Sequence, residues 1–490
     1  MRSSFILILL GLVYCLVAAA PFQKRSFKVE RKRNIHFKGY NGPRELLKAY
    51  RKYNRPLPPA LLEALKSRGG KPPAAQSTQS KMGTGFGGDE PFEPGIPPYG
   101  PGVPTPEQQG PPFVEPSTPV RPPGPDDPTA QGKPTASAPP PGYPSSNGWS
   151  GIDSTLPPIT LTGLVAATPE TNDVEYLSPV TIGMQTLHLD FDTGSSDLWV
   201  FNTLLPAAST PGHALFDPAI SSTFRLLPDT TFSITYGDDS GASGVVGRDA
   251  VTVGGVQVPD QAVELATNVS GSFVEDVRSA GILGLAFSKL NTVQPEGEKT
   301  FFENLMPTLA EPVFTADLRS GGAVGAYEFG RVDPDKFRGE MAWVGVDASE
   351  GFWQFETAGF AVGEGRNVAG LAGGPGQAIV DTGTTLMLVA QDVSDGYYKQ
   401  VEGAKEDPKV GGVTFPCDAE LPDLFVDVGG VYMAKVKGED IRFAEVDDDV
   451  CFGGVQPLDG PLQIWGDIFF KSQFVAFNGG NQSLGIAEHV

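Results

Sequence analysis

Two short segments of the chain carry residue types suited to carboxylate chemistry. Asp192-Thr-Gly-Ser-Ser and Asp381-Thr-Gly-Thr-Thr each follow a run of residues typical of a buried strand. Each is followed, 92 and 85 residues later, by a glycine preceded by two apolar residues, at Gly284 and Gly466. A single Asp-Thr-Gly is most often a surface turn. The same pattern repeated 189 residues apart predicts a duplicated lobe that places the two aspartates face to face.

The residues around the two aspartates suit a site in which their carboxylates meet. Two carboxylates held about 3 Å apart do not both ionise easily, so they share one proton. One can then take a proton from water while the other gives a proton to a carbonyl oxygen. Glycine permits the tight turn, threonine can hydrogen-bond across the axis, and the next hydroxyl can orient an aspartate. The supporting residues predicted in this way are Thr193, Gly194, Ser195, Thr382, Gly383 and Thr384.

The elements that must position these loops are short strands. Residues 177–182 and 187–191 alternate roughly between apolar and polar side chains, and residues 251–258 are typical of a hairpin with a Gly-Gly turn. Helical signals are few, and the clearest covers residues 301–306, ended by Pro307. The pattern predicts a mainly β fold class for the body that starts near residue 159.

Composition divides the 490-residue chain into segments, and this length favours two or more domains. Arg2 and the apolar residues 5–20 are typical of a secretory signal peptide. Residues 71–158 contain 24 of the 46 prolines and show no hydrophobic period. We therefore expect a signal peptide at 1–20, a basic propeptide at 21–70, a Pro-rich disordered spacer at 71–158, an N-terminal lobe at 159–340 and a C-terminal lobe at 341–490, each lobe with one of the two aspartates.

The charge is divided between a basic leader, residues 21–70, and an acidic body. The leader has a net charge of +11, and residues 71–490 have a net charge of −34. Such a leader can lie across an acidic cleft and leave when acid protonates the carboxylates. The alternative is a solvated arm that binds nucleic acid or a membrane, but a secreted acidic protein gives such an arm little to do. Repulsion among the carboxylates also suggests that the protein works in acid.

Cysteine usage agrees with a secreted protein. Cys15 lies in the expected signal peptide, which leaves Cys417 and Cys451 as an even pair in an oxidising route. We expect a disulfide, worth about 3–4 kcal/mol in the chain-entropy model; the alternative is two buried free thiols. Asn268 and Asn481 each begin an N-glycosylation triplet, a short pattern that is also common by chance.

Residues 162–490 resemble the pepsin-like aspartic proteases, and closely the secreted fungal penicillopepsin and aspergillopepsin group. Proton sharing between two aspartates is an established property of this family. The resemblance implies a bilobal fold with lobes related by a pseudo-two-fold axis, and a secreted endopeptidase made as a zymogen. It also implies that Asp192 and Asp381 are the catalytic pair, with Asp381 favoured as general base and Asp192 as acid, although the two positions are nearly symmetric in sequence. The stretches that carry the resemblance are residues 191–200, 234–238, 281–287, 379–385 and 465–470.

The resemblance also assigns residues that bind substrate. Tyr236, Gly237 and Asp238 match the tip of the flap, a hairpin that closes over the substrate, and Trp199 matches the indole that hydrogen-bonds the flap tyrosine. Without the resemblance, Trp199 and Tyr236 would be interpreted as core aromatic residues. Two further matches, Phe273 and Ile282, are expected to line a pocket for large apolar side chains next to the cut bond.

Two charged features suggest more specific roles. In the fungal relatives an acidic flap residue helps to accept lysine before the cut, which leads to the hypothesis that Asp238, next to Asp239, permits cleavage after lysine; the alternative is a solvated turn. Lys52-Tyr53 in the leader resembles the propeptide pair whose lysine contacts the catalytic carboxylates. Ordinary basic-tail composition is the alternative for that pair.

Other classes of function fit less well. The body has three histidines, none in a recognisable general-base context, no Gly-x-Ser-x-Gly and no His-Glu-x-x-His, so we expect no metal and no cofactor. No stretch after the signal peptide has the ~18–20 apolar residues that cross a bilayer. A catalytically inactive, peptide-binding protein of the same fold is the main alternative, disfavoured because both Asp-Thr-Gly triplets are intact. We expect a monomer that acts on protein or peptide substrates, with its own propeptide as inhibitor and no nucleic-acid partner.

Overall fold

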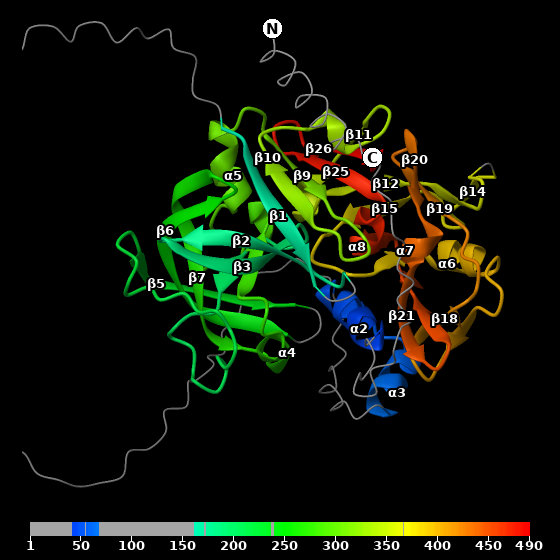
Figure 1. Ribbon diagram of the computed structural model, residues 1–490, viewed down its shortest axis with the longest axis horizontal. Coiled ribbons are helices and arrows are strands. Elements are labelled where there is room, and N and C mark those ends of the chain that lie inside the picture. The colour runs from blue at the N-terminus through cyan, green and yellow to red at the C-terminus, as the bar shows by residue number, and fades with distance from the viewer. Residues whose placement is uncertain (1–41, 54, 68–160, 171–172, 237–239, 366) are drawn as a thin grey trace, which may run out of the picture. The chain divides into compact units, whose positions relative to one another are not determined.

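The computed structural model describes residues 42–53, 55–67, 161–170, 173–236, 240–365 and 367–490. The predicted signal peptide and Pro-rich spacer lie outside these ranges, as do Gly237 and Asp238 of the predicted flap. The described chain is mainly β, which confirms the predicted fold class (Figure 1). No helix in these ranges is both long enough and apolar enough to cross a bilayer.

The strands of the body run in chain order from residue 163 to residue 488. They are β1 (Gly163–Pro169), β2 (Tyr176–Ile182), β3 (Gln185–Asp192), β4 (Leu198–Val200), β5 (Arg225–Thr235), β6 (Gly241–Val253), β7 (Val256–Val269), β8 (Gly281–Gly284), β9 (Val313–Asp317), β10 (Gly325–Phe329), β11 (Ala342–Gly345), β12 (Gln354–Thr357), β13 (Gly359–Val362), β14 (Ala369–Gly370), β15 (Gly376–Val380), β16 (Met387–Val389), β17 (Lys405–Asp407), β18 (Gly412–Pro416), β19 (Leu424–Val428), β20 (Tyr432–Val436), β21 (Arg442–Asp447), β22 (Val450–Gly453), β23 (Val455–Pro457), β24 (Leu462–Trp465), β25 (Gln473–Asn478) and β26 (Ser483–Glu488).

Helices are short, and two of them belong to the leader. They are α2 (Gly42–Lys52), α3 (Pro59–Ser67), α4 (Gly271–Glu275), α5 (Phe301–Leu305), α6 (Gln391–Tyr398), α7 (Gly438–Ile441) and α8 (Asp467–Phe470). The leader thus forms two helices separated at Pro56-Leu-Pro-Pro. Apolar side chains of α2, including Leu46 and Tyr50, are buried against the body, and the Tyr50 hydroxyl donates to the Pro457 carbonyl at 2.6 Å.

The strands form four sheets, the largest of which joins the two ends of the body. Its order is β11-β26-β25-β9-β10-β1-β2-β3-β8-β4-β7-β6-β5. Strands from before and after residue 340 share this sheet, because β9 pairs antiparallel with β25 and β11 pairs with β26. The remaining sheets are β12-β15-β24-β16-β23, β14-β13-β19-β20 and β17-β18-β22-β21. The boundary between lobes at residue 340 stays a prediction, since a continuous sheet spans it.

The sequence repeat corresponds to a repeated arrangement of three strands. In the first copy, β3 pairs parallel with β8 and places Asp192 opposite Gly284, while β4 pairs antiparallel with β8. In the second copy, β15 pairs parallel with β24, opposing Val380 to Trp465, and β16 pairs antiparallel with β24. Each apolar-apolar-Gly segment is therefore the strand against which an Asp-Thr-Gly loop is built.

Local chemistry explains the other predicted elements. The hairpin of β6 and β7 turns at Gly254 and Gly255, whose φ angles of 56° and 91° suit glycine. Helix α5 begins at Thr300 with a capping box, in which the Thr300 side chain accepts from the Glu303 N–H and the Glu303 carboxylate accepts from the Thr300 N–H. The predicted disulfide is confirmed between Cys417 and Cys451, whose Cα atoms are 4.9 Å apart.

Candidate active site

Asp192 and Asp381 lie at equivalent places, at the ends of parallel strands in the two copies of the repeat. Asp192 ends β3, and its carboxylate accepts hydrogen bonds from the Gly194 N–H at 2.8 Å and the Ser195 hydroxyl at 2.6 Å. Asp381 follows β15, and its carboxylate accepts from the Gly383 N–H at 3.1 Å and from the Thr384 hydroxyl. Each loop thus holds its own aspartate in the same way.

Thr193 and Thr382 lock the two loops together. The Thr193 N–H donates to the Thr382 hydroxyl at 3.1 Å, and the Thr382 N–H donates to the Thr193 hydroxyl at 3.0 Å. The hydroxyls in turn donate to the carbonyls of Val380 and Phe191, at 3.0 and 2.5 Å. Both threonines are buried, so the six hydrogen-bonding groups involved satisfy one another without water.

The glycines at the tips of the loops are needed for space. A Cβ atom at Gly194 would lie 2.5 Å from Asp381 Oδ1, and one at Gly383 would lie 2.4 Å from Asp192 Oδ1. Any larger residue would push the opposite carboxylate away. The two aspartates therefore approach each other because neither glycine carries a side chain.

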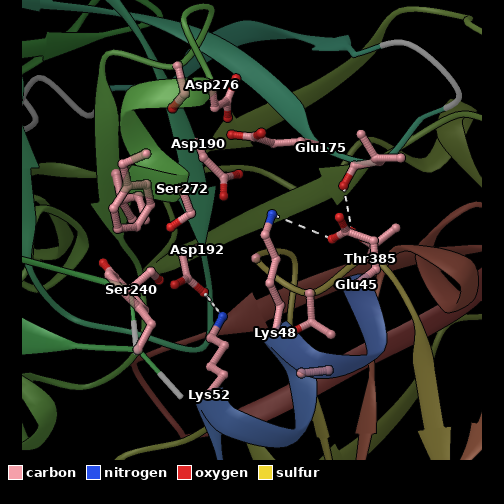
Figure 2. A pocket seen from close by; sticks show the side chains of 18 of the residues that line it. Glu45, Lys48, Lys52, Glu175, Asp190, Asp192, Ser240, Ser272, Asp276 and Thr385 are labelled. Carbon is pink, nitrogen blue, oxygen red and sulfur yellow. Dashed lines mark hydrogen bonds and ion pairs between the residues drawn. The ribbon is translucent and has the colours of Figure 1, made fainter. Parts of the chain in front are cut away.

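Lys52 of helix α2 lies between the two carboxylates. Its Nζ is 2.8 Å from Asp192 Oδ1 and 3.0 Å from Asp381 Oδ2, and its side chain is 10% exposed. Figure 2 shows this ammonium reaching Asp192 from the last turn of α2. The neighbouring Tyr53 hydroxyl donates to Asp381 Oδ2 at 2.6 Å. The Lys-Tyr pair of the leader thus contacts both aspartates.

The two aspartates differ in their pKa values. Burial, together with the negative charge of Asp381, raises the pKa of Asp192 despite the opposing effect of Lys52. Burial also acts to raise the pKa of Asp381, but Lys52 and hydrogen bonds from Asp192, Thr384 and Tyr53 lower it below its ordinary value. While the leader is bound, Asp192 is therefore the carboxyl group of the pair that protonates more readily.

The predicted aromatic residues form one cluster next to the pair. Tyr236 follows β5, and its hydroxyl accepts a hydrogen bond from Trp199 Nε1 at 2.9 Å. Phe273 meets both rings edge-on, with centroids 4.9 Å from Trp199 and 5.6 Å from Tyr236. Together with Ile282 of β8, Tyr236 and Phe273 line a cavity of about 420 Å³ beside Asp192.

Sequence reasoning missed the acidic residues of the body that line this cavity beside Asp192. Glu170 and Glu275 form salt bridges with Arg278 and Arg44, and the others are Glu175, Asp190 and Asp276 (Figure 2). One signal was available, because Asp190 is two residues before Asp192 on β3 and alternate residues of a strand share a face. Glu175 precedes β2, and Asp276 follows α4, with no pattern that links either to the dyad. Their proximity depends on how the strands fold together.

Known proteins are similar in sequence to the body of this chain. Residues 175–489 match the family described as eukaryotic aspartyl protease. The chain belongs to this family. It is 48% identical to the aspartic protease PEP3 of Coccidioides posadasii over 335 residues, which are 67% of this chain and 75% of the relative. It is also 48% identical to penicillopepsin-1 of Penicillium rubens over 330 residues, 67% of this chain and 81% of the relative. Aspergillopepsin-1 of Aspergillus flavus is 46% identical over 328 residues, 66% of this chain and 79% of the relative.

As an aspartyl protease, the chain is an aspartic-type endopeptidase that acts on protein substrates. Its mainly β architecture, with an Asp-Thr-Gly loop in each half, is the pepsin-like fold that the resemblance implied. The match begins at residue 175 and so leaves out the leader and the spacer. What the leader does is a separate question that the family match does not answer.

Proposed function

We propose that this aspartyl protease hydrolyses peptide bonds through a water molecule held between Asp192 and Asp381. The observation that carries the proposal is the single ammonium of Lys52 bound to both carboxylates, at 2.8 and 3.0 Å. Two carboxylates that one ammonium group can bridge can also be bridged by one water molecule. Lys52 Nζ therefore occupies the position in which the water would bind.

In this mechanism the two aspartates have different roles. Asp381 takes a proton from the water, whose oxygen attacks the carbonyl carbon, while Asp192 gives its proton to the carbonyl oxygen. The raised pKa of Asp192 and the lowered pKa of Asp381 support this division. Ser195 and Thr384 would keep each carboxylate in place by their hydroxyl hydrogen bonds. The tetrahedral intermediate then collapses with cleavage of the C–N bond: Asp381 gives its proton to the leaving amine, and Asp192 recovers a proton from a hydroxyl of the intermediate, which regenerates the dyad.

The leader, residues 21–70, is proposed to be an inhibitory propeptide. Helix α2 fills the site with Lys52, and the salt bridge from Arg44 to Glu275, at 3.1 Å, adds a second ionic contact with the body. Acid would protonate the carboxylates and weaken these contacts, so the propeptide would leave at low pH. The chain would thus be made as a zymogen.

The pocket next to the dyad is proposed to favour large apolar side chains. Phe273 and Ile282 supply apolar walls, and the hydrogen bond from Trp199 would hold Tyr236 of the flap over the substrate. Cleavage after lysine, through Asp238, remains a separate hypothesis. Replacement of Asp238 by threonine is expected to abolish lysine cleavage selectively, and an equal loss on phenylalanine and lysine substrates would contradict it.

We further propose that the enzyme is secreted and acts as a monomer. The apolar residues 5–20 and the Cys417–Cys451 disulfide support export to an oxidising compartment. Asn268 and Asn481 are both exposed, as glycosylation requires, and one chain supplies both aspartates of the dyad. N-terminal sequencing of the exported protein, and its mass before and after deglycosylation, would test these points.

Cleavage of denatured haemoglobin in acid tests the proposed reaction. We expect turnover that pepstatin abolishes and that Asp381→Asn reduces by at least ~10³-fold, because the general base is lost. Full activity of Asp381→Asn would contradict the mechanism. Binding of pepstatin without any turnover would instead favour an inactive, peptide-binding protein of the same fold.

A further inference from the structure

A second group of carboxylates lies in the cavity beside the dyad, formed by Glu175, Asp190 and Asp276 and here called the acidic subsite. Asp190 is 8% exposed, and its buried Oδ1 has no hydrogen-bond partner. Asp190 also lines the cavity, so this carboxyl group lies at the edge of a space that a ligand can enter while one of its oxygens has no donor. A buried acceptor in this state is costly unless a donor reaches it.

Glu175 and Asp276, the other two members of the acidic subsite, lie next to each other. The carboxyl groups of Glu175 and Asp276 are within hydrogen-bonding reach of each other. Burial, and the negative charges of Asp190 and Asp276, raise the pKa of Glu175 well above its ordinary value. The cation that opposes this rise is Lys48, and those that oppose the rise at Asp190 are Lys52 and Lys48. All of these cations belong to α2.

Lys48 shows what kind of group the acidic subsite accepts. It precedes Lys52 by one helical turn, so both lysines extend from the same face of α2. The Lys48 ammonium forms an ion pair with Glu45 of the same helix at 3.5 Å, and Figure 2 shows it pointing into the cavity on the side of Asp190, while Lys52 reaches Asp192. The leader therefore presents one lysine to the dyad and a second to the acidic subsite. When the leader departs, both cations leave with it.

We propose that the acidic subsite binds the lysine or arginine side chain of a substrate, at a position other than the one Asp238 would contact. This inference rests on the proposed peptidase function and deepens it. Apolar walls at Phe273 and Ile282 suit the methylene stem of such a side chain, and the carboxylates receive its charged end. A bound substrate lysine or arginine would thus place a positive charge near Glu175 and Asp190, as Lys48 does in the uncleaved chain.

A set of peptides with one fixed Phe-Phe bond tests the proposal on the acid-activated enzyme. Lysine is placed in turn at each position on both sides of the bond, and each peptide is compared with the one that carries uncharged norleucine there. Because burial raises the pKa of Glu175 and of Asp190, the peptides are compared at several pH values, from about 5.5 up to the highest pH at which the enzyme still cleaves the norleucine peptides. A bound lysine ammonium favours the ionised form of these carboxyl groups. We expect one position at which lysine raises kcat/KM by about tenfold, the effect of a charge-assisted contact.

Variants assign the preference to the acidic subsite. Glu175→Gln is expected to reduce the lysine-to-norleucine ratio to near one, whereas Glu311→Gln, at an exposed site, removes the same charge and leaves the ratio unchanged. Asp276→Asn provides a second test should Glu175→Gln fail to fold. Loss of the preference in Asp238→Thr alone, with Glu175→Gln unaffected, would overturn the proposal, as would the absence of any lysine preference.

The same peptides separate this inference from the proposed function. Cleavage of the norleucine peptides that pepstatin blocks reports on the dyad alone. If these peptides are not cleaved, the peptidase mechanism fails. If the norleucine peptides are cleaved, and the lysine peptide at every position is cleaved at the same rate as its norleucine counterpart, the mechanism stands and the proposal for the acidic subsite is wrong.

Discussion

Thr193 and Thr382 exchange hydrogen bonds across the pseudo-two-fold axis, each backbone N–H donating to the hydroxyl of the other residue at 3.1 and 3.0 Å. This exchange joins two loops that are 189 residues apart in the chain. The distance between the catalytic candidates therefore depends on two buried hydroxyl groups that hydrogen-bond to backbone groups.

Replacement of Thr382 by valine is expected to loosen this joint. Valine keeps the shape but removes the hydroxyl, which leaves the buried Thr193 N–H without an acceptor. Such a loss costs about 1–3 kcal/mol. We expect a lower free energy of unfolding in denaturant and at least a tenfold lower kcat. Thr382→Ser keeps the hydroxyl and should retain most of the unfolding free energy and of kcat. Equal losses in the serine and valine variants would contradict a role for the hydrogen bonds.

Trp199→Phe tests the link between the indole and the flap. Phenylalanine preserves most of the buried ring but cannot donate to the Tyr236 hydroxyl, which now accepts at 2.9 Å. We expect kcat/KM for peptides to fall by about tenfold, with a change in unfolding free energy of about 1 kcal/mol. Trp343→Phe, at a side chain that is 41% exposed, is the matched control and should leave kcat/KM unchanged. Wild-type kinetics in Trp199→Phe would show that the hydrogen bond does not position the flap.

Lys52→Met tests whether the leader inhibits through the dyad. The variant keeps a long side chain but removes the charge that both aspartates contact. We expect the full-length protein to become active, and to lose its leader, at a higher pH than the wild type. The activity of the uncleaved chain against a fluorogenic peptide, measured in steps from pH 7 to pH 3, follows this shift. Lys299→Met removes one exposed body lysine as a control. An unchanged activation pH in Lys52→Met would remove Lys52 from the inhibitory contact.

Glu264 and Asp197 predict how stability depends on pH. Both are buried, their carboxyl groups lie within hydrogen-bonding reach of each other, and burial raises the pKa of both. A carboxyl group with a raised folded-state pKa stabilises the fold below its unfolded pKa of about 4. This contribution is lost as the pH rises through the folded-state pKa.

The melting temperature should therefore be highest in acid and fall toward neutral pH. Glu264→Gln, which cannot ionise, should flatten this decline, while Glu356→Gln, at an exposed site, should not. The measurement is thermal unfolding of the pepstatin-inhibited enzyme between pH 3 and pH 8. An equally steep decline in Glu264→Gln would place the pH sensitivity elsewhere.

The sequence alone was enough to predict the dyad, because its signals are local and repeated. Each Asp-Thr-Gly follows a strand. The Gly-Gly turn at residues 254–255 and the helix cap at Thr300 likewise depend on contacts within a few residues of the chain. The division of the leader into α2 and α3 also follows from local chemistry, since proline disfavours a helical conformation in the residue before it.

Only the tertiary structure decided which distant side chains meet. Glu175, Asp190 and Asp276 come together from three separate segments, and no pattern links them. The contact of Lys52 with Asp381, across 329 residues of sequence, was expected from the family resemblance and not from local chemistry. The pairing of β9 with β25 likewise joins the two ends of the body. Strand periodicity sets which face a side chain occupies, but it carries no information about the strand that will lie beside it. The dyad could be predicted because both halves repeat one motif, whereas the acidic subsite has no repeat and forms only where the folded strands converge.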